Sequence, residues 1–263
     1  MVFMSKLNYL SAFILSLGIT ACTTSPTGRS QLVAMPEGQV NQMGVQSFNQ
    51  LKRTKPISRN QTYTTFVNCV AQAITRQIGG QWEVVVFENK ELNAFALPGN
   101  KIGVYTGLVS MVDNQHQLAA VIGHEVGHVL AKHSNERLSQ QSLAQQGLSM
   151  VTQAIGTPKT ALGQLGVAAL DPLVSYGILL PYGRTQESEA DLMGLNLMAK
   201  SGFDPQQSVN LWQKMSQASQ GQTPPEWMST HPADNTRITD LNKNMSAALK
   251  TYQQTVNRPN CSK

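Results

Sequence analysis

The sequence has few aromatic residues and no cluster of positive charge, although its formal net charge is +5. Phe, Trp and Tyr make up only 6% of the 263 residues and do not alternate with Lys or Arg, which argues against nucleic-acid binding. No run of five or six basic residues occurs, and this favours a mildly basic secreted protein over one that binds anionic lipid or acidic polymers. There is no repeat with a period of about 20–50 residues. The hydrophobic content is sufficient for one substantial core.

Long apolar runs are also scarce. The only uninterrupted one, Leu10–Ile19, follows Lys6 and is too short for a comfortable membrane span. A positive residue before a short apolar run is typical of a signal peptide, so we predict one over residues 1–21. A later candidate, Thr160–Leu180, is interrupted by Asp171-Pro172 and several glycines, and we expect no membrane span there.

The three cysteines fall into two groups. Ile19-Thr20-Ala21-Cys22 resembles a bacterial lipobox, in which the chain is cut before the cysteine and Cys22 is lipidated. A generic signal with an incidental cysteine is the alternative. Because Thr23 is not Asp, the usual sorting pattern of such lipoproteins indicates the outer membrane, facing the periplasm. We predict a flexible membrane tether over 22–36 and one folded domain over 37–263.

The other two cysteines, Cys69 and Cys261, remain once Cys22 is assigned to the anchor. In an oxidising periplasm such a pair suggests one disulfide. Two unpaired thiols are the alternative, and the sequence leaves both open.

The secondary structure is expected to be mainly helical, with one small sheet. Three short runs rich in β-branched and aromatic residues predict strands at 82–87, 92–97 and 101–106, and Pro98-Gly99-Asn100 makes the last two a hairpin. Periodic apolar residues and capping signals predict helices over 37–53, 60–78, 113–133, 135–154 and 187–201, one opening at Asp204-Pro205 and a final one around Ile238–Leu249. Helices around one small sheet predict an α+β fold.

The stretch His124-Glu125-Val126-Gly127-His128 matches H-E-x-x-H. On a helix with about 100° per residue, His124 and His128 lie about 40° apart, so both imidazoles face one side. That spacing fits two ligands of one Zn²⁺, and Glu125 lies close enough to hold a water and take its proton. Two core histidines without a metal are the alternative, but that would leave buried polar groups without partners.

A third ligand is expected from Arg184–Gly194. Glu187 and Asp191 share one helix face, and Glu189 points about 160° away from Asp191. One carboxylate can complete the metal site while the other accepts the free N–H of a ligand histidine. A solvated acidic helix start is the alternative. His133 lies about 180° round the helix from His124, so we expect a surface or second-layer residue rather than a ligand.

Five motifs together resemble those of a known zinc metallopeptidase family that includes the CAAX prenyl endopeptidases and HtpX proteases. They are NAFALPG (93–99), VYTGL (104–108), VIGHEVGHVLAKHSNER (121–137), RTQESEAD (184–191) and STHPADNTR (229–237). The missing later membrane spans make the chain similar to the periplasmic LoiP- and BepA-like subgroup. The resemblance implies a zincin-like domain with Glu187 as third ligand and Asp191 behind a ligand histidine.

The resemblance also implies further roles. The strand carrying Asn93, Ala94 and Phe95 would bind substrate backbone by strand addition. His231 would approach the metal, either stabilising the oxyanion or blocking the water position, with Arg237 assisting. A loop histidine stacked on Trp227 is the alternative for His231.

These observations predict a lipid-anchored periplasmic zinc endopeptidase with one Zn²⁺ per chain. The resemblance suggests unfolded or misassembled envelope proteins as its substrates. The rival prediction is a non-proteolytic envelope chaperone, in which the zinc is structural and the edge strand holds client chains. A structural site would have four protein ligands, whereas a catalytic site has three plus water.

Overall fold

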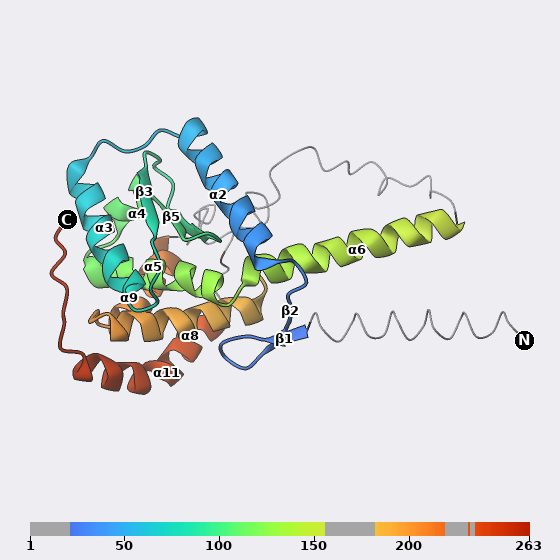
Figure 1. Ribbon diagram of the computed structural model, residues 1–263. Helices are drawn as coiled ribbons and strands as arrows, with labels where there is room; N and C mark the ends of the chain where they lie inside the picture. The colour runs from blue at the N-terminus through green and yellow to red at the C-terminus, as the bar shows by residue number, and fades with distance from the viewer. Residues whose placement is uncertain (1–21, 156–181, 219–230, 232–234) are drawn as a thin grey trace, which may run out of the picture.

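The computed structural model describes residues 22–155, 182–218, 231 and 235–263 (Figure 1). The predicted signal peptide and the stretch Thr160–Leu180 lie outside these residues. None of the helices in the described part is both long enough and apolar enough to cross a membrane. The helices are α2 (Glu37–Thr54), α3 (Gln61–Thr75), α4 (Thr106–Met111), α5 (Gln115–Leu130), α6 (His133–Ile155), α8 (Arg184–Lys200), α9 (Gln206–Ala218) and α11 (Asn235–Gln254). The strands are β1 (Cys22–Thr24), β2 (Ser30–Leu32), β3 (Glu83–Phe87), β4 (Ala94–Leu97) and β5 (Lys101–Tyr105).

The larger sheet has three strands in the order β3-β5-β4. The predicted β4–β5 hairpin is present, and its turn uses left-handed backbone at Gly99 (φ 84°) and Asn100 (φ 61°). Glycine and asparagine tolerate this region best, which explains the turn's sequence. Since β3 pairs with β5 in parallel, β4 is left as an edge strand of this sheet.

Helices cover both faces of the sheet (Figure 1). The side chains of Phe48, Phe87, Phe95 and Tyr105 form an aromatic cluster between α2 and one face. Ala94, Ala96 and Val104 point to the other face and pack in the main core with α3 and α5. Helix α5 therefore lies between the sheet and α8, and the prediction of a mainly helical α+β fold is confirmed.

Glycines let α5 and α8 approach closely. A Cβ added at Gly194 would lie 2.7 Å from the backbone nitrogen of His124, and one at Gly127 would lie 2.9 Å from the carbonyl oxygen of Ala190. Real Cβ atoms do not tolerate such distances to backbone, so only glycine fits this contact. The contact places the side chains of α8 within reach of those on α5.

The end of α5 differs from the prediction. Asn114 caps the helix with its side chain, as one of two expected residues, but α5 ends at Leu130 rather than near His133. Lys132 adopts a left-handed conformation (φ 56°) and redirects the chain, so His133 begins α6. The angular argument that placed His133 on the far side of α5 is therefore wrong. Helix α8 also begins three residues before the predicted Glu187, and α4 was not predicted.

The segment 22–36 is not the flexible tether that the sequence predicts. β1 and β2 pair as an antiparallel hairpin, which lies beside the N-terminal parts of α6 and α8 (Figure 1). Its Arg29 binds Glu136 at 2.7 Å and Glu189 at 2.9 Å. Both carboxylates are buried, and buried carboxylates require a paired cation, which the hairpin supplies. The order of this segment depends on residues more than 100 positions away.

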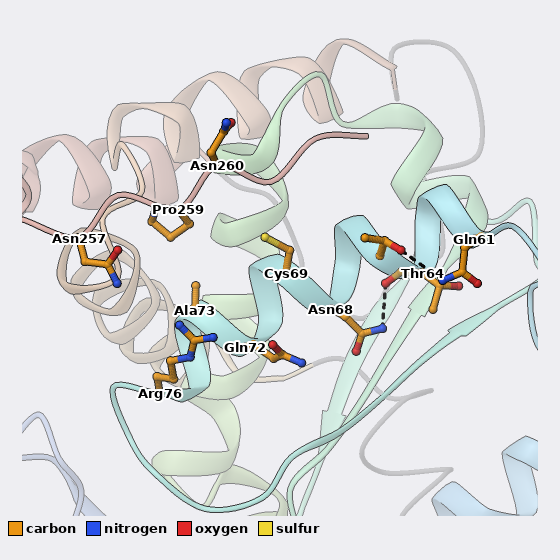
Figure 2. Close-up of a pocket in the computed structure, with 11 residues that line it drawn as sticks. Gln61, Thr64, Asn68, Cys69, Gln72, Ala73, Arg76, Asn257, Pro259 and Asn260 are labelled. Atoms are coloured by element: carbon orange, nitrogen blue, oxygen red, sulfur yellow. Dashed lines mark hydrogen bonds between the residues drawn. The ribbon is translucent and has the colours of Figure 1, made fainter.

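Cys69 and Cys261 form a disulfide with Cα atoms 5.7 Å apart. It fastens the C-terminal segment to α3. A pocket of about 480 Å³ lies between the two, and the residues that line it include Gln72, Arg76 and Asn257 (Figure 2).

Candidate metal centre

The H-E-x-x-H residues lie on the most enclosed helix of the described fold. His124, Glu125 and His128 are exposed by only 2%, 3% and 1%. The apolar residues of α5 around them pack against the sheet, α3 and α8, so the polar side chains are held in a dry environment. Any interaction among them is therefore much stronger than it would be in water.

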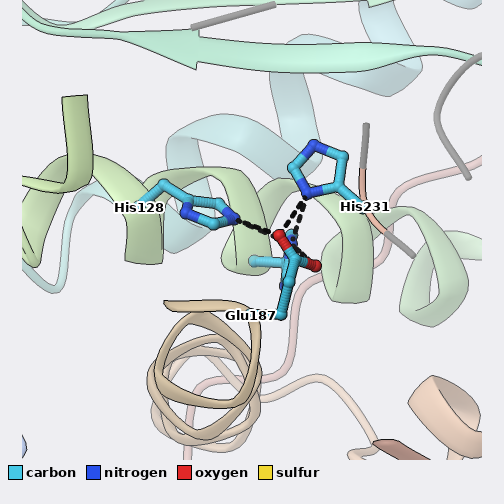
Figure 3. Close-up of side chains that lie close together, drawn as sticks. His128, Glu187 and His231 are labelled. Atoms are coloured by element: carbon cyan, nitrogen blue, oxygen red, sulfur yellow. Dashed lines mark hydrogen bonds and ion pairs between the residues drawn. The ribbon is translucent and has the colours of Figure 1, made fainter. Parts of the chain in front are cut away.

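Four buried side chains converge on one point. They are His124 and His128 of α5, Glu187 of α8, and His231, and one ligand atom from each lies within 4.8 Å of the others. Figure 3 shows Glu187 rising from α8 towards His128, with His231 above it. The two Nε2 atoms of His124 and His128 are 3.1 Å apart, as are His124 Nε2 and His231 Nδ1. Glu187 Oε1 lies 3.4 Å from His128 Nε2 and 3.0 Å from His231 Nδ1.

This donor set fits a zinc ion. Four ligands about 2.0–2.1 Å from a tetrahedral centre would be separated by about 3.3 Å, close to the observed spacings. Burial lowers the pKa of His124 and His128 well below the usual value, so both imidazoles are neutral, the form that binds metals. Burial opposes ionisation of Glu187, but the neighbouring histidines outweigh it and lower the pKa of this carboxyl. Nitrogen lone pairs that face one another in a dry site call for a cation between them.

Behind the four donors, Asp191 and Arg237 hold the ligands in place. Asp191 Oδ1 lies 2.9 Å from His124 Nδ1, as expected of a carboxylate that fixes a ligand histidine. Arg237 donates from Nη1 to Glu187 at 2.8 Å and from Nη2 to Asp191 at 2.7 Å. Its guanidinium lies 3.5 Å above the ring of Trp212. Burial raises the pKa of Asp191 to about 6, although Arg237 opposes this.

Arg237 therefore lies among the groups that orient the carboxylates. Its role in stabilising an oxyanion stays a prediction.

His231 connects the donor group to Glu125. Its Nδ1 faces His124 Nε2 and Glu187 Oε1, and its Nε2 lies 3.4 Å from Glu125 Oε1. Burial lowers the pKa of His231, but the Glu125 and Glu187 carboxylates outweigh burial and raise it. The histidine thus lies between the other donors and Glu125. Trp227, the alternative partner of His231, lies outside the described residues.

The predicted substrate strand lies next to α5. Ala94 faces α5 in the main core, whereas Phe95 packs in the aromatic cluster on the opposite face. Asn93 precedes the strand; it is buried, and its Nδ2 has no hydrogen-bond partner among the described residues. In the described sheet β4 pairs only with β5, and all four residues of β4 are buried. Substrate binding by these three residues stays a prediction.

Sequence reasoning missed several residues around His128. Tyr182 stacks on its imidazole with ring centroids 3.9 Å apart, and the Arg137 guanidinium lies 4.4 Å above Tyr182. His133 is completely buried, with Nδ1 2.8 Å from His128 Nδ1. It is the second-layer residue of the two expected alternatives. The helix angle correctly separated Glu189 from the metal donors, but it gave no sign that Glu189 is buried against His133.

The chain is similar to several curated proteases. The chain is 36% identical over 183 residues to "Metalloendopeptidase OMA1, mitochondrial" of Bos taurus, covering 68% of this chain and 35% of the relative. It is 36% identical over 160 residues to "Mitochondrial metalloendopeptidase OMA1" of Schizosaccharomyces pombe, covering 60% and 45%. It is 28% identical over 233 residues to "Beta-barrel assembly-enhancing protease" of Escherichia coli K12, covering 84% and 47%.

The chain spans half or less of the length of these relatives. Residues 57–245 match the family described as "Peptidase family M48", and this range contains all four metal donors, Glu125 and the edge strand. A match over most of the chain, with the donors converging as a zinc site requires, shows that the protein belongs to peptidase family M48.

Proposed function

We propose that this protein is a zinc-dependent endopeptidase. The single observation that carries the proposal is Glu125 next to the four-donor group, since a purely structural metal site does not need a base. The names of the OMA1 and assembly-enhancing relatives, which call them metalloendopeptidases and a protease, support the same activity.

His124, His128 and Glu187 would hold the metal. A zinc ion in such a site acidifies water and polarises a carbonyl oxygen. Glu125 would take the proton from the attacking water and pass it to the leaving amine. Asp191 would keep His124 in the tautomer whose Nε2 is free. The edge of β4 would bind the substrate backbone by strand addition, with Asn93, Ala94 and Phe95 setting its position.

His231 would have to leave for turnover. In the observed arrangement His231 fills the fourth donor position and contacts Glu125. It therefore occupies the position that a water between the metal and Glu125 would need. We infer a resting state closed by His231. Four protein donors are also the mark of structural zinc, and this observation favours the rival function, a non-proteolytic chaperone that holds client chains at β4.

The location and substrates are also part of the proposal. Cys22 is exposed and unpaired at the start of the hairpin, which suits lipidation. The proposed position is the periplasmic face of the bacterial outer membrane. The proposed substrates are unfolded or misassembled envelope proteins, supported by the name of the Escherichia coli relative. No nucleic-acid partner is proposed.

Digestion of an unfolded protein by the purified chain tests the enzyme reading. Glu125→Gln, loaded with equal zinc, should cleave about 10²–10⁴-fold more slowly, because it loses the base but keeps the donors. Glu37→Gln, an exposed change on α2, is the matched control and should cleave normally. A chelator should stop cleavage by the wild type. Equal cleavage by Glu125→Gln would refute the mechanism, and no cleavage by any zinc-loaded form, His231→Ala included, would favour the chaperone.

A further inference from the structure

The two metal-binding histidines of α5 are held in different ways. His124 Nδ1 contacts a carboxylate directly, at 2.9 Å from Asp191. His128 Nδ1 instead contacts a second imidazole, at 2.8 Å from His133 Nδ1. His133 Nε2 then lies 3.1 Å from Glu189 Oε2. A carboxylate stands behind each ligand histidine, but for His128 the contact is made through His133.

The hydrogen bonds from His128 through His133 to Glu189 form a relay. They can run in only one direction when His128 binds a metal through Nε2. Nδ1 of His128 then carries the proton and donates to His133, whose Nδ1 must accept. His133 therefore carries its proton on Nε2 and donates it to Glu189, which as a carboxylate can only accept. Each bond fixes the tautomer of the next ring, and the result leaves the Nε2 lone pair of His128 directed at the metal.

The N-terminal hairpin holds Glu189, the last residue of this hydrogen-bond relay, in place. Glu189 accepts from Thr27 Oγ1 at 2.6 Å and from Arg29 Nε at 2.9 Å. The other end of the same guanidinium binds both oxygens of Glu136, at 2.7 and 2.8 Å. The contacts with Thr27, Arg29 and His133 together hold the Glu189 carboxylate in one orientation.

We propose that His133 and Glu189, oriented by Arg29 of the β1–β2 hairpin, are positioning residues that set the tautomer and ring orientation of His128 for metal binding. The inference rests on the metal site of the proposed function. It gives the hairpin, which the sequence presents only as a tether, a direct part in building that site. His133, Glu189 and Arg29 touch no reacting atom, and their effect passes through His128.

A purely structural role for the same residues makes a different prediction. If they only stabilise the fold, replacing them lowers the melting temperature but leaves the zinc affinity of the folded protein unchanged. If they position His128, zinc affinity falls in protein that remains folded. Zinc affinity and the spectrum of bound Co²⁺ therefore separate the two roles without any measurement of cleavage.

The test uses variants that remove or keep individual hydrogen bonds of the relay. His133→Phe keeps an aromatic ring but removes both nitrogens, whereas His133→Gln offers an oxygen to His128 and an N–H to Glu189. Arg29→Met removes the guanidinium that orients Glu189, and it is the second variant if His133→Phe does not fold. Ser139→Ala is the matched control. Ser139 accepts a hydrogen bond from the Ala34 N–H and so holds the same N-terminal segment, but it does not take part in the hydrogen-bond relay.

Zinc dissociation constants are measured by chelator competition on the full chain, with melting of the metal-free forms alongside. We expect His133→Phe to bind zinc about 10–100-fold more weakly, the usual effect of losing an outer partner of a ligand histidine. His133→Gln should recover most of this loss, Arg29→Met should show a smaller loss, and Ser139→Ala should match the wild type. The d–d bands of bound Co²⁺ should shift in His133→Phe and Arg29→Met only.

Wild-type affinity and an unchanged Co²⁺ spectrum in folded His133→Phe, or in Arg29→Met if it alone folds, would overturn the positioning role and leave the proposed function intact. Failure of the wild type itself to bind zinc would overturn both. Equal weakening by Phe and Gln at position 133 would show that packing decides the affinity, and this too would overturn the proposal.

Discussion

His231 makes two contacts, with Glu187 and with Glu125, that an active hydrolase cannot keep at the same time. Its Nδ1 lies 3.0 Å from Glu187 Oε1 and its Nε2 lies 3.4 Å from Glu125 Oε1. One imidazole thus occupies a metal position and contacts the base that needs a water beside that position. Either the side chain moves or the site is silent, and a single substitution distinguishes these cases.

His231→Ala should retain zinc through His124, His128 and Glu187 and should cleave faster than the wild type. If about 10% of wild-type molecules are open at rest, the gain in cleavage rate is about tenfold. The measurement is cleavage of an unfolded protein at saturating zinc, with zinc content determined on the same samples.

His116→Ala is the control for this change, because it removes another histidine that lies outside the donor group. Loss of zinc together with loss of cleavage in His231→Ala would mean that the fourth donor is required, and the closed-resting-state interpretation would be wrong.

At this scale the sequence predicts what lies on one regular helix and fails where a helix breaks. The 40° offset of His124 and His128 and the shared face of Glu187 and Asp191 follow from helical geometry alone. His133 was misplaced because Lys132 leaves the helical region, a local choice that no periodicity reveals. Tyr182 was missed because the residues before α8 have no pattern that places them against His128.

Among the elements, the packing of α5 on α8 decides whether the site exists. The donors come from both helices, and Gly194 touches the backbone of His124 directly. A change in the spacing of these helices alters the distances from Glu187 to both histidines.

Gly194→Ala should separate α5 from α8, since its Cβ would fall 2.7 Å from His124 N. Overpacking of this kind costs about 1–3 kcal/mol of unfolding free energy. Zinc affinity should fall as well, because Glu187 moves away from the histidines. Denaturant unfolding and chelator competition measure the two effects.

Gly38→Ala serves as the control, because nothing lies within 4 Å of the added Cβ in the first turn of α2. It should be neutral or slightly stabilising. Unchanged stability and zinc affinity in Gly194→Ala would show that the helices can shift without harm, contrary to the close-contact argument.

Only some of the pairings between strands could be predicted from the sequence. The β4–β5 hairpin followed from Pro98-Gly99-Asn100, whose turn chemistry is local. The β1–β2 hairpin was not, because Ser/Thr/Gly-rich sequence is typical of a flexible segment and its docking depends on Glu136 and Glu189. Parallel pairing of β3 with β5 was also beyond the sequence, since register between distant strands is set by the assembled core.

For the whole molecule, a bound metal would add a further link between segments that packing and the contacts of Asp191 and Arg237 already hold together. The donors come from α5, from α8 and from His231, and a ligand that binds only the native state stabilises it.

Removal of zinc should therefore lower the melting temperature substantially. At a zinc concentration about 1,000 times the dissociation constant, the loss of unfolding free energy is about 4 kcal/mol. Calorimetry with and without a chelator measures the shift. A His124→Ala/His128→Ala double variant should melt at one temperature in both conditions. A wild type that is indifferent to the chelator would argue against a metal bound by these donors.

The disulfide between Cys69 and Cys261 has a consequence for self-cleavage by the proposed peptidase. The two cysteines are 192 positions apart, so nearly the whole domain forms one covalent ring. A single backbone cut inside that ring opens it without releasing a fragment. A self-nicked molecule would keep its mass until it is reduced, and its pieces would stay together in an oxidising compartment. Shedding α5 and α8 through cuts inside the ring would take two such events.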